Sequence, residues 1–195
     1  VIAFLAFSTN LVLRLLGMKT EAEEENLTEE ELRMMIELGK EKGAIDEDET
    51  EWIQNVFDFR DTSILSSMTR EADIVSLDEH STDQEIISII RESGLSRLPV
   101  YTKDREDIKG ILYTREYLLN LTAPHPRSLD QLLHDAYFVP ESIHADDLFR
   151  DMQTKKVHMA IVVDEYGNLS GLITLEDLLE EIVGNIYDEF DPVME

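Results

Sequence analysis

The sequence contains no cysteine, which excludes disulfides, thiolate metal sites and thiol nucleophiles. Basic residues are also scarce: 17 Lys and Arg stand against 43 Asp and Glu, for a formal net charge of −26. A chain of this charge repels phosphate backbones, so we expect no nucleic-acid partner. The five histidines lack His-Glu-x-x-His spacing, and neither a phosphate-loop lysine motif nor a Gly-x-Ser-x-Gly elbow is present. The sequence therefore predicts neither an enzyme nor a metal site built from side chains.

No apolar run is long enough to cross a bilayer by itself. Residues 1–13 are almost wholly apolar, but a transmembrane helix needs about 20 such residues. Arg14 and Lys19 follow this run, and basic residues favour the cytoplasmic side of a membrane. We therefore interpret residues 1–20 as the end of a longer membrane segment. The alternative is an amphipathic helix packed on the globular part of the protein.

Residues 21–61 form an acidic stretch with 16 acidic and four basic side chains. Thr28 and Glu31 have capping-box spacing, which predicts a helix that ends near Gly43. The apolar positions of this helix are Leu32, Met35 and Ile36. A second helix follows, with an apolar side made of Trp52, Ile53, Val56 and Phe57. We expect a helical hairpin whose apolar faces pair, and whose carboxylates either dock on a basic or cation-carrying surface or are simply solvated.

An internal repeat decides the architecture of the remaining chain. Residues 96–101 (Ser-Arg-Leu-Pro-Val-Tyr) and 110–113 (Gly-Ile-Leu-Tyr) correspond to residues 157–162 (Val-His-Met-Ala-Ile-Val) and 171–174 (Gly-Leu-Ile-Thr). The offset between the copies is 61 residues throughout. Each copy is therefore one supersecondary unit, and about sixty residues are too few to bury a stable core without the twin copy.

Each copy follows the order strand, helix, strand, strand, helix. The first copy predicts strands at residues 74–77, 98–101 and 109–113. Thr82 and Glu85 cap its first helix, which ends near Gly94. The second copy predicts an equivalent first strand at residues 137–139. Together the two copies predict an α/β (α+β) fold.

These segments resemble CBS domains, which occur in tandem pairs. Residues 160–167 (Ala-Ile-Val-Val-Asp-Glu-Tyr-Gly) and 171–184 (Gly-Leu-Ile-Thr-Leu-Glu-Asp-Leu-Leu-Glu-Glu-Ile-Val-Gly) are similar to the CorC/CNNM (HlyC/CorC, hemolysin-like) branch. The resemblance implies two α/β units with pseudo-twofold symmetry, preceded by an acidic helical linker. The expected domains are a membrane or juxtamembrane end (1–20), the linker (21–61), CBS domain 1 (62–123), CBS domain 2 (124–187) and an acidic tail leading to a missing C-terminal domain (188–195).

One candidate binding site lies where the strand ending at Thr174 gives way to a helix. The Thr174 hydroxyl and the free amides of that first turn face any nearby anion. The carboxylate of Asp177, one turn further, is placed to accept hydrogen bonds from both hydroxyl groups of a ribose. The same two residues also satisfy a capping box, which needs no ligand.

The resemblance implies that this cleft holds an adenine nucleotide: ATP, or AMP or ADP, with Mg2+ accompanying the nucleotide. Arg97 would reach the phosphates, although it could instead form only a surface salt bridge. The expected nucleotide-binding residues are Thr69, Leu95, Arg97, Pro99, Ile173, Thr174, Glu176 and Asp177. In the first copy, Tyr113 and Glu116 replace Thr174 and Asp177, so we expect one good nucleotide site per chain.

The resemblance also implies the biological setting. The chain would be a regulatory module on the cytoplasmic side of the cell membrane, joined to its own transmembrane domain in a transporter of Mg2+ or another divalent cation such as Co2+. It would form a homodimer through the CBS pairs. The alternative function is a structural dimerisation module that binds no ligand.

Overall fold

The computed structural model describes residues 27–184 of the chain. The expected membrane end (1–20) and the acidic tail (188–195) lie outside these residues. Within these residues, the internal contacts separate a compact unit that ends at Thr50 from a second that begins at Glu51. Within residues 27–184, no helix combines the length and the apolar character that crossing a membrane would require.

Two helices occupy the acidic stretch, α2 (Glu29–Glu41) and α3 (Glu47–Phe59). Thr28 caps α2: its hydroxyl accepts from the Glu31 amide at 3.2 Å, and the Glu31 carboxylate accepts from the Thr28 amide at 2.8 Å. Gly43 follows with φ +68°, a left-handed conformation that glycine adopts without strain. The capping-box prediction and the predicted end of this helix are therefore confirmed.

Several side chains expected on the apolar faces of this stretch are exposed. Helix α2 has no buried residue, and Met35 is 57% exposed. In α3, Trp52 and Val56 are 49% and 55% exposed. Only Phe59, at the end of α3, enters a core. The physical reason is that α3 uses its last turn for packing, while its exposed indole makes a polar contact with another helix.

The two sequence copies have the same order of elements, which confirms the prediction from the repeat. The first copy comprises β2 (Leu77–Asp78), α4 (Asp83–Ser93), β3 (Arg97–Tyr101), β4 (Ile108–Tyr113) and α5 (Thr114–Asn120). The second copy comprises β6 (Phe138–Pro140), α6 (Ala145–Lys155), β7 (Met159–Val163), β8 (Leu169–Thr174) and α7 (Leu175–Val183). Thr82 and Glu85 form the expected capping box of α4, and Gly94 ends that helix in the left-handed conformation.

Each copy forms a four-stranded sheet, and each sheet borrows its edge strand from a segment that precedes the other copy. The strand orders are β2-β3-β4-β5 and β6-β7-β8-β1. Strand β1 (Thr69–Arg70) precedes the first copy but pairs antiparallel with β8. Strand β5 (Leu133–His134) precedes the second copy but pairs with β4. The exchange ties the two copies together.

Two equivalent glycines permit this close edge pairing. A Cβ at Gly110 would lie 2.8 Å from the His134 carbonyl oxygen, and a Cβ at Gly171 would collide with the Thr69 carbonyl oxygen. A side chain at either position would therefore push the borrowed strand away from its sheet. The equivalence of the two glycines reflects the pseudo-twofold relation of the copies.

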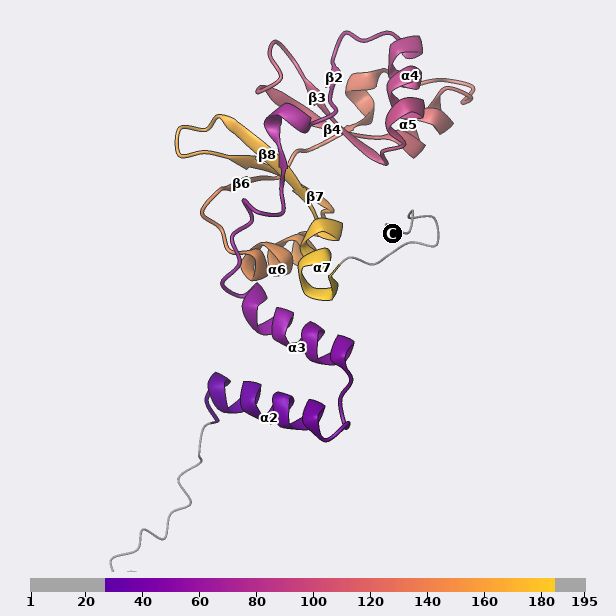
Figure 1. Ribbon diagram of the computed structural model, residues 1–195. Coiled ribbons are helices and arrows are strands. Elements are labelled where there is room, and N and C mark those ends of the chain that lie inside the picture. The colour runs from indigo at the N-terminus through magenta and orange to yellow at the C-terminus, as the bar shows by residue number, and fades with distance from the viewer. Residues whose placement is uncertain (1–26, 185–195) are drawn as a thin grey trace, which may run out of the picture. The chain divides into compact units, whose positions relative to one another are not determined.

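The core has three parts arranged in layers. Apolar residues of the first copy, including Leu98 and Leu112, form one cluster, and those of the second copy, including Ile173 and Leu178, form another. A third cluster contains Ile111 and Leu172 from the two sheets. Helices α4 and α5 lie beside the first sheet, and α6 and α7 lie beside the second (Figure 1). The second compact unit is thus a mixed α/β fold in which the two sheets meet at a shared core cluster.

Candidate functional site

The junction of β8 and α7 has the geometry that the sequence predicts. Thr174 is the N-cap of α7, and the Asp177 amide donates to its hydroxyl at 3.2 Å. Oxygen Oδ2 of Asp177 accepts from the Thr174 amide at 2.7 Å and from the Thr174 hydroxyl at 2.8 Å. No group within residues 27–184 donates to the other carboxylate oxygen, Oδ1. Asp177 can therefore cap the helix and still accept a hydrogen bond from a ligand.

A cleft of about 450 Å³ opens beside this junction. Its volume falls in the range of roughly 300–1,000 Å³ that is usual for small-molecule sites. The lining residues come from both copies: Thr69, Asp73, Ile74, Val75, Ser93, Leu95, Arg97, Pro99, Met159, Leu172, Thr174 and Asp177. Six of the eight residues expected from the sequence are among them.

The other two expected residues, Ile173 and Glu176, do not line the cleft. The Ile173 side chain is fully buried in the core of the second copy, because successive residues of β8 point to opposite faces of the sheet. Leu172 lines the cleft in its place. Ile173 could contact a ligand only through its backbone. The Glu176 side chain is 61% exposed at the rim of the cleft, where it forms an ion pair with Arg97.

Arg97 begins strand β3 and lies where the two copies meet. One guanidinium nitrogen, Nη1, is 3.5 Å from Oε1 of Glu176, and the guanidinium carbon is 5.9 Å from the centre of the Tyr113 ring. The Arg97 side chain is only 21% exposed. It therefore forms the salt bridge that the sequence offered as an alternative, and it also lines the cleft.

The charges around the cleft are unbalanced. Arg97 is the one cationic side chain of the lining set, whereas Asp73 and Asp177 are both acidic. Glu176 adds a third carboxylate at the rim, and His158 lies 4.0 Å from it. An anionic ligand would therefore have to compete with Glu176 for Arg97 and would face two more carboxylates.

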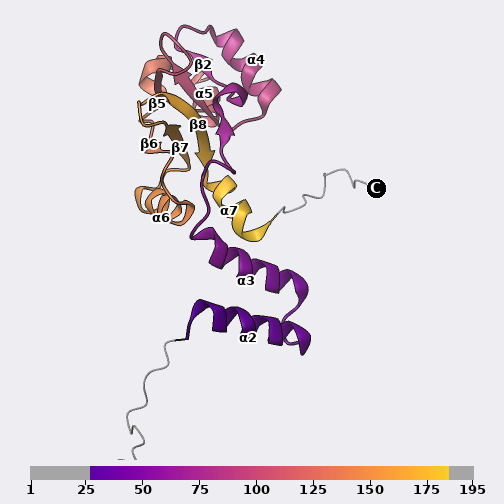
Figure 2. The same cartoon turned by 60° about the vertical axis from the view of Figure 1, so that its left-hand side comes forward.

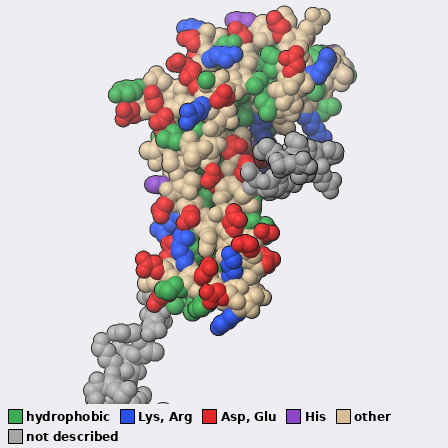
Figure 3. Space-filling view, viewed as in Figure 1, with side chains coloured by type: hydrophobic (Ala, Val, Ile, Leu, Met, Phe, Trp, Pro, Cys, Tyr) green, Lys and Arg blue, Asp and Glu red, His purple; other side chains and the backbone are tan. Residues whose placement is uncertain are grey.

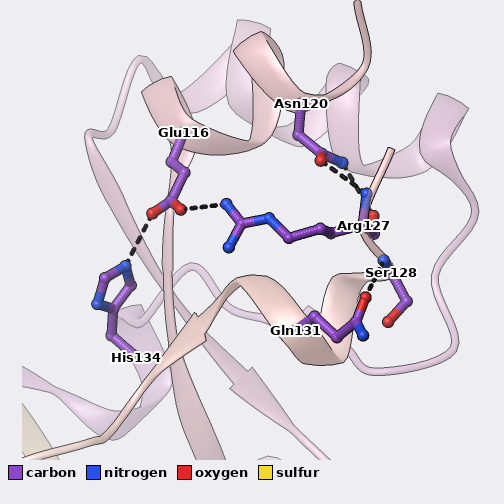
Figure 4. Close-up of polar contacts among 6 residues, drawn as sticks. All are labelled: Glu116, Asn120, Arg127, Ser128, Gln131 and His134. Atoms are coloured by element: carbon purple, nitrogen blue, oxygen red, sulfur yellow. Dashed lines mark hydrogen bonds and ion pairs between the residues drawn. The ribbon is translucent and has the colours of Figure 1, made fainter. Parts of the chain in front are cut away.

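The equivalent residues of the first copy are engaged with one another. The Tyr113 ring stacks on His134, with 4.2 Å between ring centres. Glu116, equivalent to Asp177, holds His134 Nε2 at 2.9 Å and Arg127 Nη2 at 2.6 Å (Figure 4). These hydrogen bonds, first from His134 and then from Arg127, lower the pKa of Glu116. Both residues that would have to hold a ligand thus already have partners.

A second cavity, of about 580 Å³, lies next to this first-copy cluster. It is lined by Tyr113 at the end of β4, by residues of α5 and by the loop that follows, with no residue of the second-copy elements β6 to α7 among its walls. It therefore differs from the cleft at Thr174, which both copies form. The two copies are similar in backbone but not in the chemistry of their sites.

Sequence reasoning missed several cleft residues. Leu172 could have been found from strand alternation, because it shares a face of β8 with Thr174. Asp73, Ile74 and Val75 belong to a 3-10 turn, η1 (Glu71–Asp73), and the segment after it. The strand expected at residues 74–77 is wrong for residues 74–76, because Ile74 follows directly on this turn and packs into the core cluster between the two sheets, and β2 begins only at Leu77. Ser93 and Met159 reach the cleft through the tertiary fold alone.

Comparison with protein-family models gives two matches. Residues 62–122 and 130–184 match the model of the CBS domain. Residues 1–49 match the model described as the Cyclin M transmembrane N-terminal domain.

Known proteins with similar sequences and structures agree with these matches. The chain is 36% identical to the magnesium and cobalt efflux protein CorC of Escherichia coli K12 over 163 residues, which are 83% of this chain and 56% of CorC. The chain spans 28–56% of the length of the curated relatives that it matches. A CBS domain structure of a bacterial CNNM/CorC family Mg2+ transporter has a TM-score of 0.76 at 38% identity, covering 83% of this chain and 99% of that one. A CBS domain structure from that family in complex with ATP has a TM-score of 0.65 at 37% identity, covering 70% and 97%.

Proposed function

The chain belongs to the CBS domain family, as a domain pair of the CNNM/CorC type, and we propose that it binds one adenine nucleotide in the cleft at Thr174 and thereby regulates a membrane transporter of divalent cations. The observation that carries this proposal is the convergence of Thr174, Asp177 and Arg97, from both copies, on one cleft of suitable size. A similar CBS domain is known in complex with ATP.

The chemistry of the cleft fits the parts of a nucleotide. Oδ1 of Asp177 is free to accept from ribose hydroxyls, which are hydrogen-bond donors. The N-terminal turn of α7 offers amide groups and the positive end of the helix dipole to phosphate oxygens. Arg97 adds a charge-assisted contact for the same oxygens. Leu95 and Pro99 give the cleft an apolar wall that suits the adenine ring.

Mg2+ would reduce the repulsion between a triphosphate and the carboxylates around the cleft. A bare triphosphate must displace Glu176 from Arg97 and approach Asp73 and Asp177. Mg2+ prefers phosphate and carboxylate oxygens as ligands, so an ion carried in with the phosphates would offset this repulsion. We therefore expect ATP to bind much more weakly when Mg2+ is removed by a chelator, and Glu176→Gln to reduce that dependence on Mg2+.

The setting of the module follows from its relatives. CorC is named as a magnesium and cobalt efflux protein, and similar CBS structures come from Mg2+ transporters. In this proposal the CBS pair lies on the cytoplasmic side of the cell membrane, joined to its own transmembrane domain. The transported ion is then Mg2+ or a related divalent cation, and binding of the nucleotide regulates the transporter.

Self-association of the pair belongs to the same proposal. Leu118 on α5 and Leu179 on α7 occupy equivalent positions in the two copies and are 42% and 41% exposed. Burial of two such leucines against a second copy would favour a homodimer. Light scattering at tens of micromolar should give twice the chain mass, and the double variant Leu118→Glu, Leu179→Glu should give a monomer. A wild-type monomer with and without nucleotide would contradict this part.

A thermal shift experiment tests the nucleotide proposal. A ligand that binds only the folded protein stabilises it by about 2.7 kcal/mol at a hundredfold excess over Kd, which corresponds to about 5–11 °C in Tm. We expect such a rise with ATP plus Mg2+ or with AMP, relative to no ligand. Arg97→Gln should reduce the rise for ATP more than the rise for adenosine, because it removes a phosphate contact only.

The alternative function is a structural dimerisation module without a ligand. The capping box of Thr174 and the Arg97–Glu176 pair both form without a nucleotide, as that alternative requires. It would gain support if no adenine nucleotide raised Tm while the dimer remained intact.

A further inference from the structure

The last turn of α7 is held by two side chains of α3 that are far away in the sequence. The indole Nε1 of Trp52 donates to the Val183 carbonyl oxygen at 3.0 Å. The Asn55 amide Nδ2 donates to the Ile182 carbonyl oxygen at 3.2 Å. The final carbonyls of a helix have no partner within it, so they are open to such donors. Figure 2 shows α3 and α7 side by side at this point. We call these two hydrogen bonds the α3–α7 latch.

The first turn of the same helix forms the candidate nucleotide site. Helix α7 has nine residues, so its two ends are only about 13 Å apart. Its middle is fixed by Leu178, which is fully buried in a core cluster that also contains Phe59 of α3. A short helix packed in this way moves as one body. A shift of Asp177 is therefore passed to the latch.

Two opposing forces act on the latch. A groove of about 520 Å³ beside α7 is lined by four carboxylates, those of Glu51 from α3 and of Asp177, Glu180 and Glu181 from α7. Their mutual repulsion favours separation of the two helices. The latch and a 2.5 Å hydrogen bond from Ser67 to Glu181 oppose it. Figure 3 shows Asp and Glu side chains scattered over one face of the protein. Because Trp52 is half exposed, the contact can open without disrupting the core.

Helix α3 is also the covalent route toward the N-terminus. It begins at Glu47 in the first compact unit and continues past Glu51 in the second. Any change in the direction of α3 must reach the residues that precede it.

From this geometry we infer that Trp52 and Asn55 position α7 for nucleotide binding, and that occupancy of the cleft is transmitted through the α3–α7 latch to α3. The inference rests on the proposed nucleotide site and adds the residues that connect the site to the linker. With the latch closed, the first turn of α7 is held ready for the nucleotide. Loss of the latch therefore weakens binding, and binding in turn alters the surroundings of Trp52.

Trp52 is the only tryptophan of the chain, so its fluorescence reports on the latch directly. We expect titration with ATP plus Mg2+ to change the Trp52 emission, with a midpoint equal to the Kd from calorimetry on the same sample. The Asp177→Asn variant should lose both signals over the same concentration range. Heat of binding with unchanged emission would overturn the latch inference and leave the nucleotide site intact. Absence of both signals in the wild type would overturn the inference together with the proposed function.

A pair of matched variants tests the positioning role. Asn55→Ala removes one hydrogen bond of the latch, and we expect a Kd about two- to tenfold weaker. Gln54→Ala changes the neighbouring residue of α3, which has no hydrogen bond to α7, and should leave Kd within about 1.5-fold. If Asn55→Ala does not fold, Asn55→Asp removes the donor at nearly constant size and should weaken binding at least as much. Equal affinity in the Asn55 and Gln54 variants would overturn the positioning role.

Discussion

Asp177→Asn separates the two roles of Asp177, helix capping and ligand binding. The carboxylate uses Oδ2 to accept from Thr174 at 2.7 and 2.8 Å, and an asparagine carbonyl can accept the same two bonds. The change therefore keeps the cap but removes the negative charge offered to ribose hydroxyls. Hydrogen bonds to charged groups contribute about 1.5–3 kcal/mol, so Kd for the nucleotide should weaken about 10- to 150-fold.

Glu116→Gln is the matched control, because Glu116 occupies the equivalent position in the first copy but is paired with His134 and Arg127. We expect it to leave Kd within about twofold. Calorimetry on the two variants and the wild type measures both effects, with circular dichroism to confirm the fold. Unchanged affinity in Asp177→Asn, or equal losses in both variants, would refute the assignment of the site to the second copy.

Two further predictions concern stability. Leu178→Ala should lower the free energy of unfolding by about 2–5 kcal/mol, because Leu178 is fully buried beneath α7, and scanning calorimetry should show a Tm about 4–20 °C lower; a Tm within 1 °C of wild type would contradict the packing of α7. Glu116→Gln should lower Tm by only about 1–3 °C at pH 7, because its partners are partly exposed. Since His134 and Arg127 lower the folded-state pKa of Glu116, this stabilisation is present above the unfolded pKa and is lost as the pH falls through the folded pKa. The Tm difference should therefore vanish in acid, and a difference that persisted there would contradict the ion-pair assignment.

The parts of the fold that the sequence predicted correctly depend on short-range signals. Thr28, Thr82 and Thr174 each lie three residues before an acid, and each caps a helix. The constant offset between copies predicted the order of elements, because equivalent residues form equivalent structures. Such signals need only the few residues that interact within one turn or one strand.

The parts that the sequence did not predict depend on long-range contacts. Strands β1 and β5 are two residues long and pair with the sheet of the other copy, so neither has a pattern of its own. The partners of Glu116 lie 11 and 18 residues away in the sequence. The sequence pattern places Trp52 on an apolar helix face. Its hydrogen bond to the Val183 carbonyl oxygen joins residues 131 positions apart, which no local pattern indicates.

The cleft was predicted mainly through the resemblance to a family. Local pattern alone placed Thr174 and Asp177 together, and it could not choose between a cap and a ligand site. The structure shows that the cap uses one oxygen of Asp177, Oδ2, so the two roles are compatible. Strand alternation places the Ile173 side chain in the core, so the sequence pattern leaves only the backbone of Ile173 available to a ligand.

Calorimetric titration of the wild-type chain with ATP plus Mg2+ measures directly whether the chain binds a nucleotide, and how many. We expect saturable heat with one nucleotide bound per chain, because the first-copy residues Tyr113 and Glu116 are already engaged with His134 and Arg127. Two equivalent nucleotides per chain would contradict the assignment of a single site, and no heat with ATP, ADP or AMP would contradict nucleotide binding itself.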